Sequence, residues 1–226
     1  DLDILLWLTG SHCTKVSAFG GLSYFRAENA PAGSAERCCD CPVRDACRFN
    51  AYRVYTPLLG QWPADVVCLE QTEAALDKAL REGPYGRCVF RCDNNVCDHM
   101  SMILEFENGV CAVFTVSAFS LRNTRTIKLM GTEGEIGGCM EDGEITLRRF
   151  CDESETKISV THDNTKHCGG DGGLMNYFAS ALEDKNYKTD HRIFEAHALA
   201  FKAEKSRLNS LVHRRSRKSS ARINLS

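Results

Sequence analysis

Four of the thirteen cysteines fall in one short segment, Arg37-Cys38-Cys39-Asp40-Cys41-Pro42-Val43-Arg44-Asp45-Ala46-Cys47. Cys38 and Cys41 have the C-x-x-C spacing, which lets two thiolates bind one metal ion from a single tight turn. Cys47 can supply a third thiolate after Pro42 redirects the chain. The segment therefore has the residue types and spacing of a structural zinc site, which would stabilise a loop that buries little apolar surface.

A tetrahedral site needs a fourth ligand, for which the candidates are Cys39, Cys88 and Cys92. The predicted ligand set is Cys38, Cys41, Cys47 and Cys88. Only one C-x-x-C pair is present, so two other interpretations stay open: a thiol-rich loop without metal, or a disulfide-prone pair. A catalytic metal is disfavoured, because four thiolates leave no open coordination position.

Two further segments carry polar side chains that suit a hydroxyl-rich ligand. One is Asp93-Asn94-Asn95-Val96-Cys97-Asp98-His99, and the other is the glycine-rich His167-Cys168-Gly169-Gly170-Asp171-Gly172-Gly173 before a predicted helix. Taken singly, these residues fit structural roles such as helix capping. Together they can donate and accept hydrogen bonds, and histidine and aspartate can carry protons. The predicted substrate-binding residues are Asn94, Asp98, His99, His167 and Asp171.

The composition is that of an ordinary globular protein, with 43% hydrophobic and 26% charged residues and a formal charge of −2. This charge gives no drive toward nucleic acid, and we interpret the basic run after residue 211 as a disordered tail rather than a nucleic-acid site. No apolar run approaches the length of a membrane span. We expect free thiols in a reducing cytoplasm, because the chain is longer than most disulfide scaffolds.

The hydrophobic periodicity predicts the elements that must hold these side chains. An apolar helix opens the chain and ends at Gly10, and a loop-like cysteine-rich insertion covers residues 20–60. Further helices are predicted over residues 70–81, 173–183 and 194–211. Strands are predicted over residues 15–19, 88–93, 100–106, 110–119, 125–130, 144–150 and 156–161, with a short one after the turn at 131–134.

Asn108-Gly109 is expected to supply two left-handed residues to a hairpin turn. Consecutive strands joined by short turns predict antiparallel pairing. The expected class is α+β, an open and mainly antiparallel sheet with helices on one face, over residues 1–211. No G-x-G-x-x-G follows a strand, so the chain has no dinucleotide-binding fingerprint of its own.

Four segments, in this order, resemble the C-terminal domain of the glucose–fructose oxidoreductase, inositol dehydrogenase and rhizopine-catabolism (Gfo/Idh/MocA) family. They are residues 1–10, 128–136, 167–174 and 198–207. The resemblance implies a dihydrodipicolinate-reductase-like C-terminal fold that binds substrate and makes oligomer contacts through its sheet. It also implies a preceding Rossmann domain that binds NAD or NADP, and hydride transfer to or from a sugar or cyclitol.

The resemblance implies that the catalytic lysine belongs to the Rossmann domain and that a catalytic histidine directly precedes Asp1. No catalytic residue is then expected in this chain, which should be inactive alone. The Gly-rich loop carries Cys168 where the family usually has glycine. The alternative function is a noncatalytic, zinc-stabilised dimerisation or interaction module.

Overall fold

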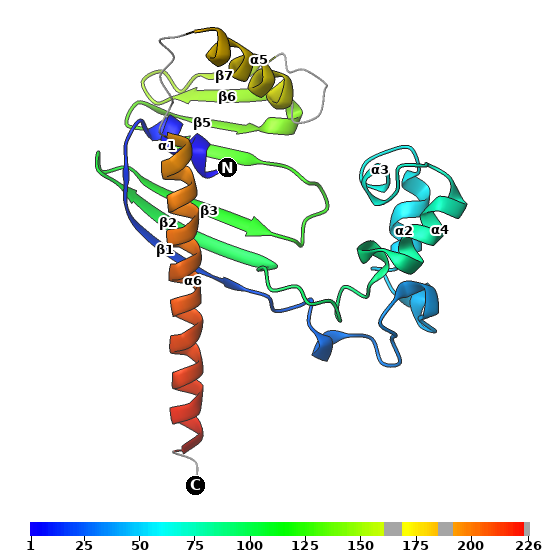
Figure 1. Cartoon of the computed structure of the whole chain (residues 1–226). Helices are drawn as coiled ribbons and strands as arrows, with labels where there is room; N and C mark the ends of the chain where they lie inside the picture. The colour runs from blue at the N-terminus through cyan, green and yellow to red at the C-terminus, as the bar shows by residue number, and fades with distance from the viewer. Residues whose placement is uncertain (161–168, 185–191, 224–226) are drawn as a thin grey trace. The chain divides into compact units, whose positions relative to one another are not determined.

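The computed structural model describes residues 1–160, 169–184 and 192–223 of the chain, with side chains as far as residue 211 (Figure 1). The strands are β1 (Cys13–Gly21), β2 (His99–Phe106), β3 (Cys111–Ser117), β4 (Thr126–Met130), β5 (Gly134–Cys139), β6 (Glu144–Arg149) and β7 (Glu155–Ser159). The helices are α1 (Leu2–Thr9), α2 (Ala51–Tyr55), α3 (Ala64–Val67), α4 (Glu73–Glu82), α5 (Gly170–Glu183) and α6 (Arg192–Ile223).

The α+β class is confirmed, but the strands form two sheets rather than one. A three-stranded sheet has the order β1-β2-β3, a four-stranded sheet has the order β4-β5-β6-β7, and every paired strand is antiparallel to its neighbour. The chain divides into two compact units, residues 1–119 with 192–226, and residues 120–191. Helix α6 extends past the predicted end at residue 211 and continues to Ile223. The basic run after residue 211, which we interpreted as a tail, therefore begins within this helix.

The core of the first unit lies between the β1–β3 sheet and helices α1 and α6, which cover one of its faces (Figure 1). Strand β2 alternates buried and exposed residues, so Met102, Leu104 and Phe106 point inward. They meet Leu6 of α1 and Leu199 of α6, both 2% exposed. Burying each such side chain contributes about 1.5–3 kcal/mol, so α6 is an integral part of this sheet's core.

Helix α6 also protects the edge of the sheet. Strand β1 is an edge strand, whose outward N–H groups would otherwise invite pairing with another chain. The Ala18 N–H donates to Ser206 Oγ of α6 at 3.0 Å. At the other end of the helix, the Glu195 carboxylate accepts from the Cys13 N–H at 3.3 Å and pairs with His12 at 2.7 Å. Strand β1 is therefore held along its length by one helix.

The turn of the β2–β3 hairpin differs from the expected one, in which Asn108 and Gly109 would both be left-handed. Gly109 has φ of +83°, but Asn108 does not have a positive φ. The Gly109 N–H donates to Phe106 O at 3.0 Å, and the Asn108 side chain accepts from the Val110 N–H at 3.2 Å. The loop therefore needs one left-handed residue, as in a hairpin where a type I turn precedes a left-handed glycine.

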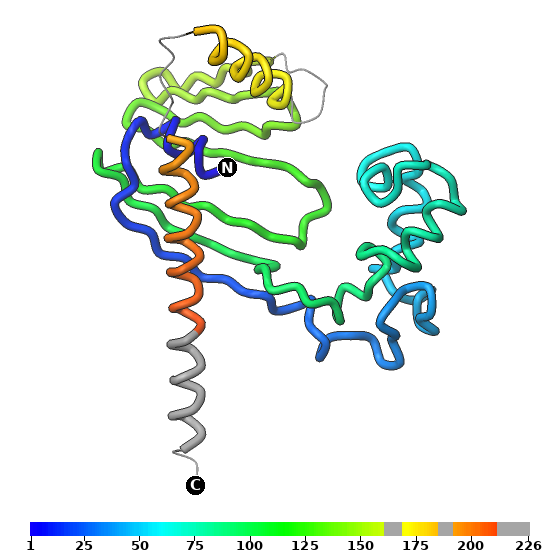
Figure 2. The backbone as a smooth tube through the Cα atoms, in the orientation of Figure 1, coloured from blue at the N-terminus to red at the C-terminus, as the bar shows by residue number. Residues whose placement is uncertain are grey.

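Between β1 and β2 the chain makes an excursion over residues 22–98, longer than the predicted insertion at 20–60 (Figure 2). It contains α2, α3, α4 and five 3-10 turns: η1 (Ala27–Asn29), η2 (Cys38–Asp40), η3 (Arg44–Ala46), η4 (Thr56–Leu58) and η5 (Pro84–Gly86). Helix α4 begins at its N-cap Thr72, whose hydroxyl accepts from the Ala75 N–H at 3.2 Å.

The prediction of a strand over residues 88–93 is wrong. The Arg91 and Cys92 N–H groups both donate to Cys88 O, at 2.9 and 3.0 Å, which closes a tight turn. The excursion has its own small core, in which the fully buried side chains are Leu76 and Leu80 of α4, with Ala51 and Cys38 beside them. Few apolar side chains thus hold a segment with no strand in its described structure.

The second unit contains the β4–β7 meander and α5. Charged side chains alternate in sign across adjacent strands: Lys128 pairs with Glu135 at 2.7 Å, Arg148 with Glu135 at 3.2 Å, and Arg148 with Glu155 at 2.8 Å. These half-exposed cross-strand pairs add modestly to the stability of the meander. Helix α5 displays exposed apolar side chains, among them Leu174 at 64% and Leu182 at 72%.

Two neighbouring glycines of β1 provide a test of how closely the strands approach. A Cβ on Gly20 would lie 2.4 Å from His99 O and 2.7 Å from the Met100 Cα, whereas one on Gly21 would meet only Leu211, at 3.8 Å. Gly20→Ala should lower the free energy of unfolding by about 1–3 kcal/mol, because the β2 backbone has to move. Gly21→Ala is the matched control and should be near neutral in urea unfolding. Equal losses would contradict the predicted contact.

Candidate functional site

The Asp98 carboxylate is the most heavily hydrogen-bonded side chain among the predicted site residues. It is 3% exposed and lies immediately before β2. Its oxygens accept from the backbone N–H groups of Ser23, Tyr24 and Phe25, at 2.9, 2.7 and 3.4 Å. The Ser23 hydroxyl adds a fourth bond at 3.3 Å. Asp98 therefore holds the loop that follows β1 and has little capacity left for a ligand.

These contacts also set the charge of Asp98. Burial raises the pKa of the carboxyl, but the hydrogen bonds from Tyr24, His99, Ser23 and Phe25 outweigh it and hold the pKa well below its usual range. Asp98 is consequently an anion wherever the protein is folded near neutral pH. The sequence alone could not have identified its loop partners, which lie far away in the chain.

His99 is held by this anion. Its Nδ1 lies 2.7 Å from Asp98 Oδ1, and its side chain is 49% exposed. An anionic partner assigns the proton to Nδ1, which leaves Nε2 as the nitrogen that can accept a proton or a ligand hydrogen bond. Ser23 Oγ also lies 3.4 Å from Nδ1. His99 thus has the oriented, accessible imidazole that proton transfer requires.

Of the other predicted substrate-binding residues, Asn94 belongs to the same unit as this pair. Asn94 is exposed, and its side chain accepts from the Val96 N–H at 3.0 Å in a local turn. Asp171 lies in the first turn of α5, whose N-cap is Gly169, and it belongs to the second unit. A carboxylate there favours the helix through the macrodipole. His167 falls outside the described residues.

The structure shows a hollow of about 440 Å³ that was not predicted. Its floor is formed by the inward side chains of β2 and β3, and its wall by the start of α1 and one face of α6. The lining residues are Asp1, Leu2, Asp3, Met100, Met102, Phe114, Val116, Ala196, His197, Ala200, Ala203 and Glu204. The hollow is broad and open to solvent, with an apolar floor and a few charged groups at its edge.

The polar groups of this hollow differ in how firmly they are held. His197 Nδ1 lies 2.8 Å from Ile193 O, one helical turn earlier, which leaves Nε2 available. Glu204 accepts two hydrogen bonds from the buried Arg207, at 2.7 and 2.5 Å, and the Arg207 hydrogen bond holds the pKa of Glu204 below its usual range. The hollow can therefore present a fixed carboxylate and an imidazole to a ligand above apolar side chains.

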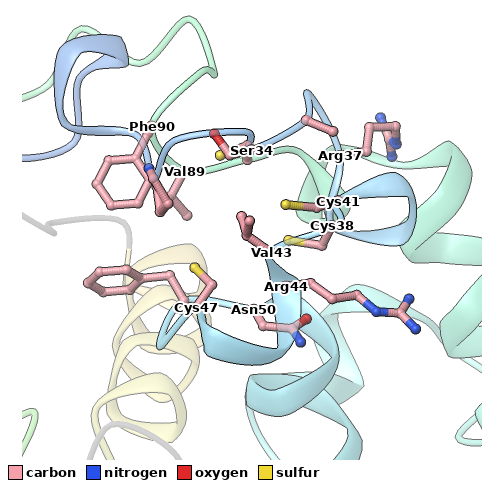
Figure 3. A pocket seen from close by; sticks show the side chains of 14 residues that line it. Ser34, Arg37, Cys38, Cys41, Val43, Arg44, Cys47, Asn50, Val89 and Phe90 are labelled. Atoms are coloured by element: carbon pink, nitrogen blue, oxygen red, sulfur yellow. The ribbon is translucent and has the colours of Figure 1, made fainter.

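The four predicted zinc ligands line one small cavity of about 20 Å³ (Figure 3). Cys38 and Cys88 are buried, and Cys41 and Cys47 are partly exposed. Burial raises the pKa of the Cys38 thiol, and the Cys88, Cys47 and Cys41 thiols add to this in the same direction. Every cysteine in the described residues is a free thiol. The structure thus brings Cys88, which is distant in the sequence, beside Cys38, Cys41 and Cys47.

As the side chains stand, no three histidine, cysteine or acidic residues in the described part of the chain form a group that could hold a metal ion. The cavity wall includes Phe49 and Phe90, which continue into a ring cluster with Tyr24, Phe25 and Phe119. The paired ring centroids in this cluster lie 5.2–6.0 Å apart. It connects the cysteine cavity with the loop that Asp98 holds.

The anchoring role of Asp98 can be measured. Asp98→Asn should lower the free energy of unfolding at pH 7 by about 2–3 kcal/mol, because backbone donors lose a charged acceptor. Asp93→Asn is the control, since that carboxylate is 85% exposed and pairs only with Arg87 among the hydrogen bonds and ion pairs seen. Chemical denaturation measures both variants. A loss of stability of the same size in Asp98→Asn and Asp93→Asn would argue against an anchoring role for Asp98.

The lowered pKa of Asp98 predicts that the effect of Asp98→Asn on stability depends on pH. The folded-state pKa of Asp98 is lowered, so its stabilisation is present above the unfolded carboxyl pKa of about 3.9 and declines as pH falls toward the folded pKa. The difference in stability between wild type and Asp98→Asn should therefore be constant from pH 7 to 5. It should shrink below about pH 4. A difference that grows on acidification would have the wrong sign.

No protein-family model matches the chain, and no curated protein matches it. No helix in the described residues is long and apolar enough to cross a membrane. Among solved structures, the chain is similar to UDP-N-acetylglucosamine 3-dehydrogenase GnnA from Acidithiobacillus ferrooxidans, at 10% identity and a TM-score of 0.47. The match covers 90% of this chain and 42% of that one.

A protein from Thermotoga maritima described as an oxidoreductase is similar at 11% identity and a TM-score of 0.44. That match covers 91% of this chain and 41% of the other. The chain thus spans about two-fifths of the length of each of these proteins.

Proposed function

We propose that this chain is the substrate-binding and oligomerisation domain of an NAD(P)-dependent oxidoreductase that acts on a sugar, a cyclitol or a derivative by hydride transfer. The sequence resemblance to Gfo/Idh/MocA dehydrogenases supports the proposal. The cofactor, NAD or NADP, would be held by a Rossmann domain of the same protein. The chain alone would then be inactive, because hydride transfer requires a nicotinamide beside the substrate.

The observation that carries the proposal is the hollow at the start of α1. Asp1 and Asp3 belong to its lining. The resemblance places a catalytic histidine directly before Asp1, and thus beside this hollow. A sugar ring would lay its C–H face on the partly exposed Met100 and Phe114 side chains and direct hydroxyls to Asp3 and His197. His99 projects from the opposite face of β2 to Met100 and Met102, so it is not part of this hollow. The glycine-rich loop with His167 and Asp171 stays a proposed contributor to substrate binding.

The exposed face of the β1–β3 sheet supports the oligomerisation part of the proposal. Phe19, Ile103 and Val113 project from this face and are 50%, 51% and 71% exposed. They are near neighbours, because Ile103 pairs with Val113 and Ser17 pairs with Ile103 across the strands. Exposed apolar side chains grouped on one sheet face are typical of contact surfaces. We assign this face to a second copy of the chain.

The alternative, a noncatalytic dimerisation module stabilised by zinc, is favoured by the four-cysteine cavity alone. A metal-stabilised fold and a stable dimer fit both functions. Binding of a polyhydroxylated ligand in the hollow fits only the oxidoreductase domain. The two functions are therefore separated by ligand and nucleotide binding.

Nucleotide titration tests the enzyme assignment. The protein encoded with its natural upstream residues should bind NADH or NADPH, and the 226-residue chain should bind neither, because it lacks a glycine-rich strand–helix turn. Fluorescence or calorimetric titration measures both. Dinucleotide affinity in the 226-residue chain, or none in the longer protein, would refute the proposal.

Within the longer protein, His197→Gln should raise KM for the sugar at least about tenfold, since a lost ligand hydrogen bond costs about 1.5 kcal/mol. The Kd for NADH should not change, because the nucleotide belongs to the other domain. His12→Gln is the matched control, since His12 is an exposed histidine that does not line the hollow. An unchanged KM in His197→Gln would remove this residue from the site.

The sheet face can be tested independently. Val113→Glu places a charge within the exposed apolar group, on the edge strand β3, and should weaken self-association at least ~100-fold, as an uncompensated charge does in an interface. Light scattering coupled to size exclusion gives the mass. Lys78→Glu, an exposed substitution on α4, is the control. An oligomer that survives Val113→Glu would place the interface elsewhere.

A further inference from the structure

The cysteine cavity is built by a run of turns with a period of three. The Cys41 N–H donates to Cys38 O, Arg44 to Cys41, Cys47 to Arg44, and Asn50 to Cys47, at distances of 3.1–3.4 Å. The turns are separate, because Cys41 and Cys47, which end η2 and η3, have extended backbone. All five of these residues line the cavity. The backbone therefore brings three thiols to one side of a short segment.

The fourth thiol arrives from the other end of the excursion. Arg37 and Arg87 form an antiparallel bridge, and the Cys88 N–H donates to Glu36 O at 2.8 Å. This pairing sets Cys88 beside the turn that contains Cys38. Cys39 and Cys92, the other candidates for a fourth ligand, do not line the cavity. Their sulfurs instead bond to Asp40 Oδ2 and Val89 O, at 3.3 and 3.5 Å.

Donors and positive charges surround the thiols. The Ala51 N–H donates to Cys38 Sγ at 3.5 Å, a contact that orients a ligating sulfur. Arg37 and Arg44 also line the cavity. Arg37 Nε is buried and has no hydrogen-bond partner in the described residues, although its terminal nitrogen donates to Leu80 O and Gly83 O. The charge of Arg44 is partly balanced by Asp45, whose carboxylate lies 3.6 Å from it.

The number and type of the ligands select the kind of metal centre. In their present positions the thiols surround a space of about 20 Å³, which is that of a single ion or water molecule. Soft thiolates select zinc, copper(I) or iron, and four in a closed tetrahedral set favour zinc in a structural role. Figure 3 shows the thiols of Cys38, Cys41 and Cys47 directed toward the interior of the cavity.

We propose that Cys38, Cys41, Cys47 and Cys88 bind a single divalent metal ion of the zinc class, which holds the excursion over residues 22–98 together. Ligands about 2.3 Å from zinc lie about 3.8 Å from one another, so binding requires the four sulfurs to rearrange to that spacing. Each thiol can move by rotation about one side-chain torsion. The four thiols release their protons to solvent on binding.

The ion would stabilise the excursion, whose apolar core is small. Its apolar core contains few fully buried side chains, and small cores commonly need a metal or disulfides. Because Phe49 and Phe90 belong to both the cavity wall and the ring cluster, the ion would also order the loop beside Asp98 and His99. Its role is therefore structural and separate from the proposed nucleotide chemistry.

Metal analysis of the purified full chain under reducing conditions tests the proposal. One equivalent of zinc per chain is expected, and Co²⁺ loading should give the absorption of a tetrahedral tetrathiolate centre. Ser substitution at any of the four ligands should weaken zinc binding at least ~100-fold in chelator competition. Cys39→Ser and Cys92→Ser are matched controls, which should keep wild-type affinity.

A second variant guards against simple misfolding. Cys47→His should retain one metal ion, because zinc accepts imidazole, while the thiolate-to-cobalt charge-transfer band falls by about one quarter. Absence of bound zinc after loading, equal losses in the control variants, or four irons with inorganic sulfide would each overturn the proposal. So would a disulfide between any two of the four cysteines that persists under reducing conditions.

Discussion

The buried Asp98 carboxylate is the contact on which the first unit depends. The chain leaves the sheet after β1 and returns to it only at β2, and Asp98 lies at that return. Its side chain holds the departing loop through Ser23, Tyr24 and Phe25, while its own N–H donates to Gly21 O at 3.0 Å. Its carbonyl accepts from the Ala118 N–H at 2.8 Å, beyond the end of β3. One residue thus joins all three strands of the sheet to the loop.

This joint explains how an excursion with little core of its own can remain attached to the sheet. The ring cluster of Tyr24, Phe25, Phe49, Phe90 and Phe119 combines side chains from both ends of the excursion with one that follows β3. Its Phe49 and Phe90 then form part of the cysteine cavity. The anion, the rings and the thiols form one continuous chain of contacts, with His99 at its solvent-exposed end.

Periodic patterns in the sequence predicted the regular elements well. The alternation along residues 100–106 and the left-handed Gly10 at the end of α1 are both present in the structure. Cys38, Cys41 and Cys47 line one cavity as their local spacing predicted, whereas Cys88 was one of three candidates for the fourth position and is brought there by the fold. The pattern misled at residues 88–93, where Cys88, Phe90 and Cys92 alternate as in a strand. Two of these side chains face the cavity of a turn instead.

What the sequence could not give were contacts between distant residues. Nothing near Asp98 indicates that its partners are the backbone N–H groups of residues 23–25, since any residue type can supply them. The hollow beside α1 was missed for the same reason, because it forms only where α6 crosses strands far earlier in the chain. The division into two units likewise depends on pairing that periodicity does not encode.

The discontinuous first unit has a consequence for biosynthesis. Strands β1 to β3 are complete at residue 117, but Leu199 and Ala203, which cover their inner face, emerge from the ribosome only after residues 120–191. At a translation rate of about 5–20 residues per second, roughly 4–16 s pass between the synthesis of β3 and that of the α6 residues that cover the apolar face of the sheet. A nascent chain that pairs β1 to β3 early therefore exposes this apolar face until α6 has been synthesised.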